Sequence, residues 1–293
     1  MRITDGMVSR NLLTNINSSR ETMNVYSQQQ ATGKRLNKVS DDPVDYTKVE
    51  SFRSIIIKND QYLDGIGLAK GYIDISLTSL EQMNEGIMSA KDIALKASDV
   101  SQTQKDYDVY KDQIEDIIED TISLTNSTFM GNSIFAGTKT DTENAFIYNS
   151  TSVTYTGNDK KISRKIADNY YVDVNVTGRE LINTNLFSRL IDFKEALANG
   201  DISTISDSID RLDEVSESVT KLNSSLGSVK MQIINTENRI NTANLNLKSY
   251  LSNLEDADMA EAITNYKSEE TAYQAALHAT SNAINLNILN FLR

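Results

Sequence analysis

The chain contains no cysteine and no tryptophan, and its 293 residues include one proline and one histidine. Without cysteine it can form neither disulfides nor thiolate metal sites, and it has no thiol nucleophile. With His278 as the sole histidine, a zinc site or a serine hydrolase triad would lack its usual companions. We therefore expect no enzyme of these classes and no metal or cofactor.

Long apolar runs and clustered basic charge are also missing. No stretch approaches the roughly 18 consecutive apolar residues of a membrane-spanning helix, and residues 1–20 lack a basic region followed by an apolar run. We expect neither membrane insertion nor a cleaved signal peptide. The net charge is −12, with 29 basic residues scattered among 41 acidic ones. Because nucleic acid requires clustered Lys and Arg, we expect no nucleic-acid partner.

Two long stretches instead repeat apolar residues every three or four positions. They cover residues 49–87 and 212–254, where Thr236 interrupts the second. Such a repeat predicts a helix packed along one seam, and each would span on the order of 60 Å. A shorter repeat over residues 107–124 follows a polar break. The expected fold is mainly α, an elongated antiparallel helical bundle or coiled coil built from both chain ends.

Between residues 132 and 178 the pattern changes to short β-rich runs separated by glycines. Alternation is clearest over residues 171–176, which predicts a strand there. The run over residues 133–136 is a further expected strand. We expect residues 132–178 to form a small β-rich domain inserted between helices, and a helix over about residues 185–198 to follow it.

We expect two breaks between helices near the chain ends, one before Pro43 and one after Leu254, and call each of them a joint. Asp42 can cap a helix whose first turn holds Pro43, so a helix should begin at Pro43, after a first helix over residues 5–31. The long second repeat loses phase between residues 254 and 259. The expected domains are a terminal helix pair (1–42 with 256–293), a long helical bundle (43–131 with 179–255) and an outer β domain (132–178).

The residues at these joints carry a family resemblance. Residues 31–43 run from Ala-Thr-Gly-Lys-Arg-Leu to Ser-Asp-Asp-Pro, and residues 253–258 and 273–276 read Asn-Leu-Glu-Asp-Ala-Asp and Tyr-Gln-Ala-Ala. These segments resemble the N-terminal motif and the C-terminal region of the bacterial flagellin superfamily. The residues matching the turn motif are Gly33, Arg35, Asn37, Ser40, Asp41, Asp42 and Pro43.

Within the superfamily, Met-Arg-Ile-Thr at residues 1–4, the Ser-Asp-Asp-Pro turn and residues 132–142 resemble the branch at the junction between hook and filament. The resemblance implies a non-enzymatic structural subunit that templates flagellin assembly, exported by the flagellar type III apparatus to the extracellular flagellum. Flagellin itself stays open as the nearest alternative. Flagellins more often carry Lys-Asp-Asp-Ala at the turn, and the β insertion with its Phe-Ala-Gly-Thr run at residues 135–138 favours the junction. A type III needle-tip or translocation protein and a secreted enzyme on a helical scaffold are further alternatives.

The thin apolar stripes of the two terminal helices are the expected subunit interface, with an intramolecular core as the alternative. Its residues are Leu12, Ile16, Met23, Tyr26, Tyr266, Tyr273, Leu277, Ile284, Ile288 and Phe291. The resemblance implies as partners copies of this chain in a ring or helical assembly, a first hook-associated protein, flagellin and an export chaperone. The chaperone would hold Tyr273, Leu277, Ile284, Ile288 and Phe291. Because so thin a stripe cannot offset chain entropy, the terminal pair should be disordered in the free monomer.

Two other patterns have plain explanations. Gly65, Gly67 and Gly71 hint at a nucleotide loop, but they lie inside a helical repeat, and we interpret them as helix glycines at a point of close packing. An acidic cluster lies opposite the apolar stripe of the helix over residues 107–124, which predicts a solvated face rather than a metal site. Its members are Asp112, Glu115, Asp116, Glu119 and Asp120.

Overall fold

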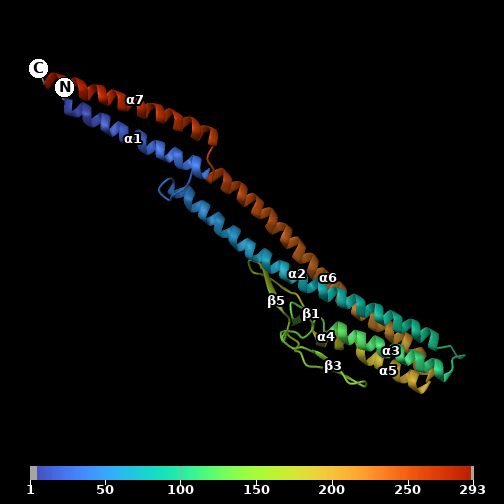
Figure 1. The fold of residues 1–293 in the computed structure, drawn as a ribbon. Helices are drawn as coiled ribbons and strands as arrows, with labels where there is room; N and C mark the ends of the chain where they lie inside the picture. The colour runs from blue at the N-terminus through green and yellow to red at the C-terminus, as the bar shows by residue number, and fades with distance from the viewer. Residues whose placement is uncertain (1–4, 100, 292–293) are drawn as a thin grey trace. The chain divides into compact units, whose positions relative to one another are not determined.

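Long helices from both ends of the chain and a group of short strands make up the fold, as the computed structural model shows (Figure 1). It describes residues 5–99 and 101–291, with side chains at residue 7 and over residues 10–99 and 101–282. The predicted mainly α class with an inserted β-rich region is confirmed. The chain divides into two compact units, residues 1–58 with 242–293 and residues 59–241. The finer division into three domains stays a prediction.

The helix boundaries follow local signals in the sequence. A helix begins at Pro43 as predicted, and the phase break after residue 254 separates two helices. A short helix at residues 178–182 was not predicted, although Thr177 and Glu180 form a capping box before it, a pattern that the sequence displays. The helices are α1 (Asp5–Thr32), α2 (Pro43–Ala97), α3 (Gln104–Thr125), α4 (Gly178–Ile182), α5 (Leu186–Asn199), α6 (Ile202–Glu255) and α7 (Met259–Phe291).

The strands form three antiparallel pairs in the described part of the chain, and each pair is a hairpin of neighbouring strands. They are β1 (Thr128–Phe129), β2 (Asn132–Ser133), β3 (Phe146–Tyr148), β4 (Val153–Tyr155), β5 (Ser163–Ala167) and β6 (Tyr170–Asp173). The first strand therefore precedes residue 132, where the β-rich region was expected to start.

Two predicted strands are too long. The one expected over residues 171–176 ends at Asp173, and beyond it the side chain of Asn175 accepts the Ile162 N–H at 2.6 Å, where a strand would offer a backbone carbonyl. The strand expected over residues 133–136 ends at Ser133. The Ile134 N–H still donates to the Ser127 carbonyl at 3.1 Å, but no strand continues through residues 134–136. Ile134 and Phe135 are fully buried in the core, so burial of apolar residues there does not indicate a strand.

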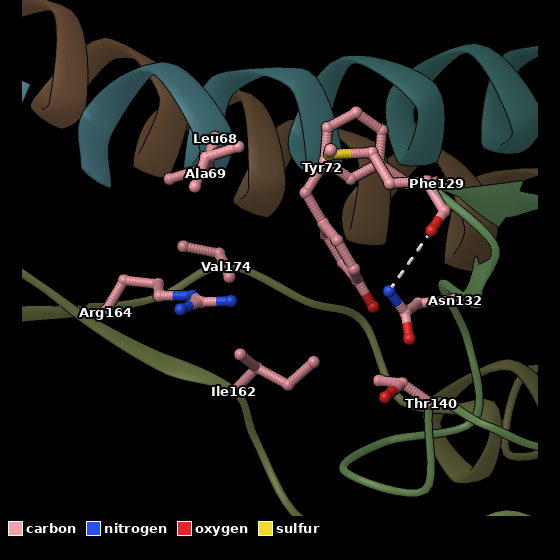
Figure 2. A pocket seen from close by; sticks show the side chains of 10 residues that line it. Leu68, Ala69, Tyr72, Phe129, Asn132, Thr140, Ile162, Arg164 and Val174 are labelled. Carbon is pink, nitrogen blue, oxygen red and sulfur yellow. Dashed lines mark hydrogen bonds between the residues drawn. The ribbon is translucent and has the colours of Figure 1, made fainter. Parts of the chain in front are cut away.

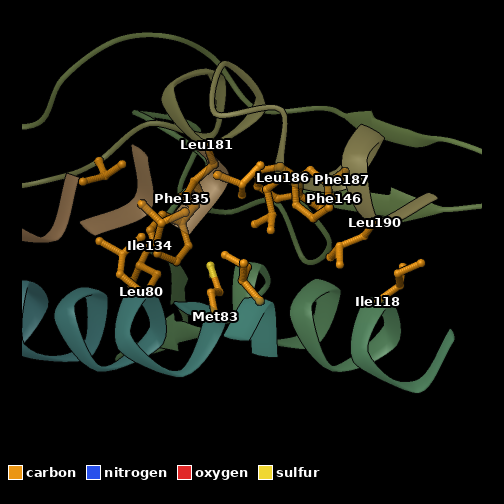
Figure 3. Close-up of a cluster of buried hydrophobic side chains, with 14 of the residues drawn as sticks. Leu80, Met83, Ile118, Ile134, Phe135, Phe146, Leu181, Leu186, Phe187 and Leu190 are labelled. Atoms are coloured by element: carbon orange, nitrogen blue, oxygen red, sulfur yellow. The ribbon is translucent and has the colours of Figure 1, made fainter. Parts of the chain in front are cut away.

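The core of the second unit lies where α2, α3, α5 and α6 meet the β-rich region. Ile66, Ile73, Leu80 and Ile87 of α2 recur every seven residues and are all buried, as the repeat predicted. Figure 3 shows Leu80 and Met83 facing Ile134 and Phe135. On α3 the buried stripe runs through Ile118, whereas Ile117, expected in it, is half-buried.

The first unit has a much smaller core. Its buried apolar residues, among its described side chains, are Leu36, Val49 and Ala262. Helices α1 and α7 lie side by side (Figure 1), and most of their apolar residues are half-buried or exposed. Since apolar burial is the main favourable term in folding, this unit has little to hold its terminal helices together.

Candidate functional site

The two joints of the first unit are hydrogen-bonded to each other. The backbone N–H of Ala257 donates to the Gly33 carbonyl at 2.9 Å, and the N–H of Arg35 donates to the Glu255 carbonyl at 2.6 Å. Lys34 and Asp256 form an antiparallel bridge between these bonds. Gly33 ends α1 with a φ of +70°, a conformation that a side chain would strain. Residues more than 200 positions apart thus form one short ladder.

The turn that follows α1 is held by its own side chains. One oxygen of Asp41 accepts the N–H groups of Asn37 and Lys38, at 3.0 and 2.9 Å. The Asn37 amide donates to the Lys34 carbonyl at 2.9 Å. Asp42 caps α2 by accepting the N–H groups of residues 44 and 45, as predicted from the sequence. The exposed residues of the motif are Arg35, Ser40, Asp41 and Pro43.

Arg35 connects the start of α2 with the end of α6. Its Nη2 donates to the Leu254 carbonyl at 2.8 Å and lies 3.3 Å from an oxygen of Asp45. The hydrogen bonds from Lys48 and Arg35 hold the pKa of Asp45 below its ordinary value. Asp45 also lies in the first turn of α2, where a carboxylate faces the free amides of the helix. Both partners of this ion pair therefore have a second structural role.

Glu255, at the end of α6, is the buried charge where the two joints meet; from here on the two joints together are called the joint. Its side chain is fully buried, and its carboxylate pairs with Lys34 and, at 2.5 Å, with Nη2 of Arg53. Partial burial lowers the pKa of Arg53, but the carboxylates of Glu50 and Glu255 outweigh that effect and raise it overall. The Oε2 atom of Glu255 has no hydrogen-bond partner among the described residues. A buried carboxylate of this kind costs free energy unless its cationic partners stay in place.

Sequence reasoning missed this role of Glu255, although the residue belongs to the quoted Asn-Leu-Glu-Asp-Ala-Asp segment. The available signal was its position, directly after Leu254, the last residue of the apolar repeat. Its cationic partners lie far away in the sequence, with 202 positions between Arg53 and Glu255. The pairing could therefore not be found from spacing.

The predicted interface residues of the terminal helices lie as follows. Leu277 of α7 is 44% exposed. The Gln30 side chain ties the two helices by donating to the Ala262 carbonyl at 3.1 Å. The side chains of Ile284, Ile288 and Phe291 lie outside the described residues. The half-buried members of the stripe are Leu12, Ile16, Met23, Tyr26, Tyr266 and Tyr273. Whether these residues contact other subunits stays a prediction.

The terminal helices also expose apolar residues outside the predicted stripe. Leu13 and Val25 of α1 are 54% and 50% exposed, and Ile263 of α7 is 50% exposed. The sequence signal for them was present, because each is a large apolar residue off the half-buried stripe of its helix. A single copy of the chain leaves these side chains in water, which is unfavourable for residues of this size.

The remaining candidates carry no catalytic or metal geometry. His278 is exposed, and within the described residues no group of three or more His, Cys, Asp and Glu could hold a metal. Over the same residues no helix is long and apolar enough to cross a membrane. The acidic cluster of α3 is exposed as predicted, except at Glu115. That carboxylate pairs with Lys194 at 2.8 Å and accepts the Tyr148 hydroxyl at 3.1 Å.

Two family models match most of the chain. The bacterial flagellin N-terminal helical region matches residues 3–140, and the bacterial flagellin C-terminal helical region matches residues 209–292. The chain belongs to the bacterial flagellin family. The bridge between Lys34 and Asp256 lies within the segments that define the family, since both residues fall in the matched ranges.

Relatives of this flagellin-family chain include both hook-associated proteins and flagellins. Flagellar hook-associated protein 3 of Escherichia coli (strain K12) is 22% identical over 315 residues, which cover 98% of each chain. Flagellin FljK of Caulobacter vibrioides is 24% identical over 290 residues, which cover 96% of this chain and 94% of the relative. Identity alone thus does not separate the two groups.

Two solved structures are similar in fold to this chain. A putative flagellar hook-associated protein from Vibrio parahaemolyticus gives a TM-score of 0.68 at 20% identity, covering 74% of this chain and 100% of that one. The flagellar junction protein FlgL from Legionella pneumophila gives 0.58 at 11% identity, covering 72% and 100%. The flagellin-family chain therefore has a FlgL-like fold.

Proposed function

We propose that this chain is the structural subunit that joins the hook to the filament of the bacterial flagellum and templates the assembly of flagellin. The observation that carries the proposal is the match to hook-associated protein 3 over 98% of both chains, which includes the small β-rich region as well as the terminal helices. The likeness in fold to a protein described as the flagellar junction protein FlgL supports it.

The role we propose depends on shape and contact rather than on chemical reaction. The chain would assemble with copies of itself in a ring or helical array, with a first hook-associated protein on one side and flagellin on the other. The exposed apolar residues of α1 and α7 support this, because assembly would remove Leu13, Val25 and Ile263 from water. No catalytic step is part of the proposal.

A subunit that assembles outside the cell must first be exported. We propose export by the flagellar type III apparatus, with a chaperone that covers the C-terminal helix beforehand. The absence of cysteine suits this route, because the chain cannot form disulfides at any stage. Tyr273 and Leu277 of α7 are the described residues of the chaperone surface, together with Ile284, Ile288 and Phe291, whose side chains lie outside the described part.

Flagellin is the second candidate function, favoured by the 24% identity to flagellin FljK over nearly the whole chain. A filament subunit and a junction subunit share the paired joints and the terminal helices. They differ in the copy number and position of the chain in the flagellum, which a genetic experiment separates.

The experiment is a deletion of the gene, followed by electron microscopy of the cells and immunoblotting of the medium for flagellin. For a junction subunit we expect complete hooks, no filaments and flagellin monomers released into the medium. Filaments that persist but are shortened or altered would assign the chain to the flagellins. Unchanged flagella would overturn both functions. A plasmid carrying the intact gene is the control and should restore filaments.

A further inference from the structure

A pocket of about 190 Å³ opens between α2 and the β-rich region of the second unit. Leu68 and Ala69 of α2 form one wall, and Ile162 and Val174 of the β-rich region form the opposite wall (Figure 2). Small-molecule sites usually have volumes of about 300 to 1,000 Å³. This pocket is smaller, and its size suits an apolar side chain of a partner protein rather than a cofactor.

Arg164 of β5 is the charged residue in the lining of this pocket. Its guanidinium points into the space between Val174 and Ile162 (Figure 2). Within the described residues Arg164 makes no ion pair, whereas Lys161 pairs with Glu180 and Lys165 with Asp168. A guanidinium beside apolar walls favours a planar carboxylate, which it can bind with two hydrogen bonds.

The rim of the pocket has the character of a contact surface. Met130, at the tip of the hairpin of β1 and β2, is 74% exposed, and Leu68 is 49% exposed. Met130 has a φ of +52°, an unfavourable conformation for a residue other than glycine, asparagine or aspartate. Met, Arg and aromatic residues are enriched at protein interfaces, and Phe129 adds an aromatic ring to this set.

The basic charge near the pocket is concentrated in a chain that is otherwise acidic. Lys160, Lys161, Arg164 and Lys165 lie within six positions, although the net charge of the chain is −12. The partner surface that fits therefore combines an exposed apolar side chain with carboxylates. A polymer of identical subunits carries both complementary surfaces on every copy, because its contacts are heterologous.

The outer face of α3 has this combination. Val109 is 51% exposed, and Asp112, Asp116 and Glu119 follow it at helical spacing on the same face, all exposed. The side chain of Asp112 is 76% exposed. Asp112 has Lys111 of the same helix 3.3 Å away. Among the described residues, Glu115 is the carboxylate of the acidic cluster with a partner on another element, Lys194, and it lies at the edge of this face.

We propose that the pocket beside Arg164 receives Val109 of a second copy of this chain, with Asp112 of that copy paired to the Arg164 guanidinium. This contact rests on the proposed function, because it requires the chain to assemble with itself. It gives the junction a contact between neighbouring subunits that does not involve the terminal helices.

A cysteine cross-link tests the contact directly, because the natural chain contains no cysteine. The variant Met130→Cys with Val109→Cys, expressed in the deletion strain, is oxidised in isolated flagella and immunoblotted. Both positions are exposed, so the variant should fold. We expect a ladder of covalent multimers, and monomers from either single variant. Filaments present without the ladder would overturn the contact and leave the proposed function intact.

Charge reversal decides the question if the cysteine pair prevents assembly. We expect Arg164→Glu to lower the number of filaments per cell by about tenfold, since a charge pair at an interface becomes a repulsion. Adding Asp112→Arg should restore filaments. Lys221→Glu, a charge reversal at an exposed lysine of α6, is the control and should leave the number unchanged. Normal filaments with Arg164→Glu would contradict the contact. Failure of Asp112→Arg to restore filaments would also contradict it, provided that the double variant unfolds at the temperature of the natural chain.

Discussion

Glu255 shows how one side chain can fix a joint between segments that are distant in sequence. It is fully buried, while its partners Lys34 and Arg53 are 41% and 37% exposed. The cations can be hydrated when the pair is broken, but the carboxylate cannot be without opening the joint. The stability of the joint therefore depends on both cations, because the loss of either one leaves the buried carboxylate less compensated.

Replacing this carboxylate should loosen the joint. Glu255→Gln keeps the shape but removes the charge that holds Lys34 and Arg53, and we expect a loss of about 1 to 2 kcal/mol in local stability. Hydrogen exchange of the Arg35 and Ala257 amides measures it, because both donate across the joint. Glu217→Gln is the control, since Glu217 is an exposed residue of the same helix. Unchanged exchange at both amides would contradict this role of Glu255.

The acid stability of the second unit should depend on Glu180. Burial raises its pKa, but hydrogen bonds from Lys161 and Thr177 outweigh burial and hold the pKa below its ordinary value. A lowered folded-state pKa contributes stability above the unfolded-state pKa, and this contribution is lost as the pH falls through the folded-state pKa. The side chain is 36% exposed, so solvent screening limits the contribution to about 1 kcal/mol.

Denaturant unfolding between neutral pH and about pH 3 measures this dependence. Glu180→Gln should be less stable than the natural chain at neutral pH, and the difference should shrink in acid. Glu195→Gln, an exposed change on α5, should leave the pH profile as it is. A constant difference at all pH values would mean that the charge of Glu180 is not involved.

At the scale of the element, α2 shows that its glycines are not equivalent. A Cβ placed at Gly71 would lie 2.9 Å from the ring of Phe129, whereas one at Gly67 would meet nothing within 4 Å. Both are helix glycines, as interpreted from the sequence, and of these two Gly71 is the point of close packing. Gly71 lets the hairpin of β1 and β2 approach α2.

Alanine substitutions should separate the two positions. Gly67→Ala should stabilise the second unit by about 0.5 to 1 kcal/mol, because alanine favours a helix over glycine. Gly71→Ala gains the same helix propensity but displaces Phe129, so we expect it to be about 1 kcal/mol less stable than Gly67→Ala. The midpoints of urea unfolding compare them. Equal midpoints would show that Phe129 moves aside at no cost.

Helix α7 should matter for assembly more than for the folded monomer. Leu277 is 44% exposed, so Leu277→Asp removes little burial from a single chain. In an assembly that covers this residue, a buried carboxylate without a partner is strongly unfavourable. We expect the variant to lose filaments while the second unit unfolds at the same temperature. Leu277→Met, which conserves volume, should assemble. Normal filaments from Leu277→Asp would remove this residue from the interface.

At the scale of the whole molecule, the two units differ in how much apolar surface they bury. The second unit buries the parts of the long repeats that lie within it, from Ile66 to Ile87 on α2 and from Leu212 to Ile240 on α6, together with Phe135, Phe146 and Phe193. The end of the second repeat, in the first unit, is not buried as expected, since Tyr250 is 57% exposed. In the first unit, among the described side chains, only Leu36, Val49 and Ala262 are buried apolar residues. Local stability follows local burial, so the terminal helices should open most easily.

Limited proteolysis of the purified monomer tests this difference. Trypsin should cut first in the terminal helices, at sites such as Arg20 and Lys267, and leave a fragment that contains residues 59–241. Lys91 of α2, which is paired with Asp213 at 2.5 Å, should resist cleavage. Mass spectrometry identifies the fragments. Termini that survive as long as the second unit would contradict the expectation that they fold on assembly.

The sequence could be interpreted most reliably where a local signal decides the structure. Asp42 and Pro43 start α2 because capping and a fixed φ act within one turn. The seven-residue spacing from Ile66 to Ile87 indicates the buried face of α2, since helix geometry turns spacing into direction. The Thr177 and Glu180 capping box was equally local and was overlooked. Strand ends were less accurate, because buried residues such as Ile134 need not lie in strands.

The sequence by itself determined the long helices, the position of the joints and membership of the flagellin family, because these depend on periodicity, caps and short motifs. Only the tertiary structure decided which charges pair between segments that are distant in the sequence. Glu255 with Arg53, and Glu115 with Lys194, are set by how distant segments meet. It also decided that Arg164 points into an apolar pocket. The physical reason is that spacing along a chain fixes neighbours on one helix, whereas contacts between elements arise from packing of the whole core.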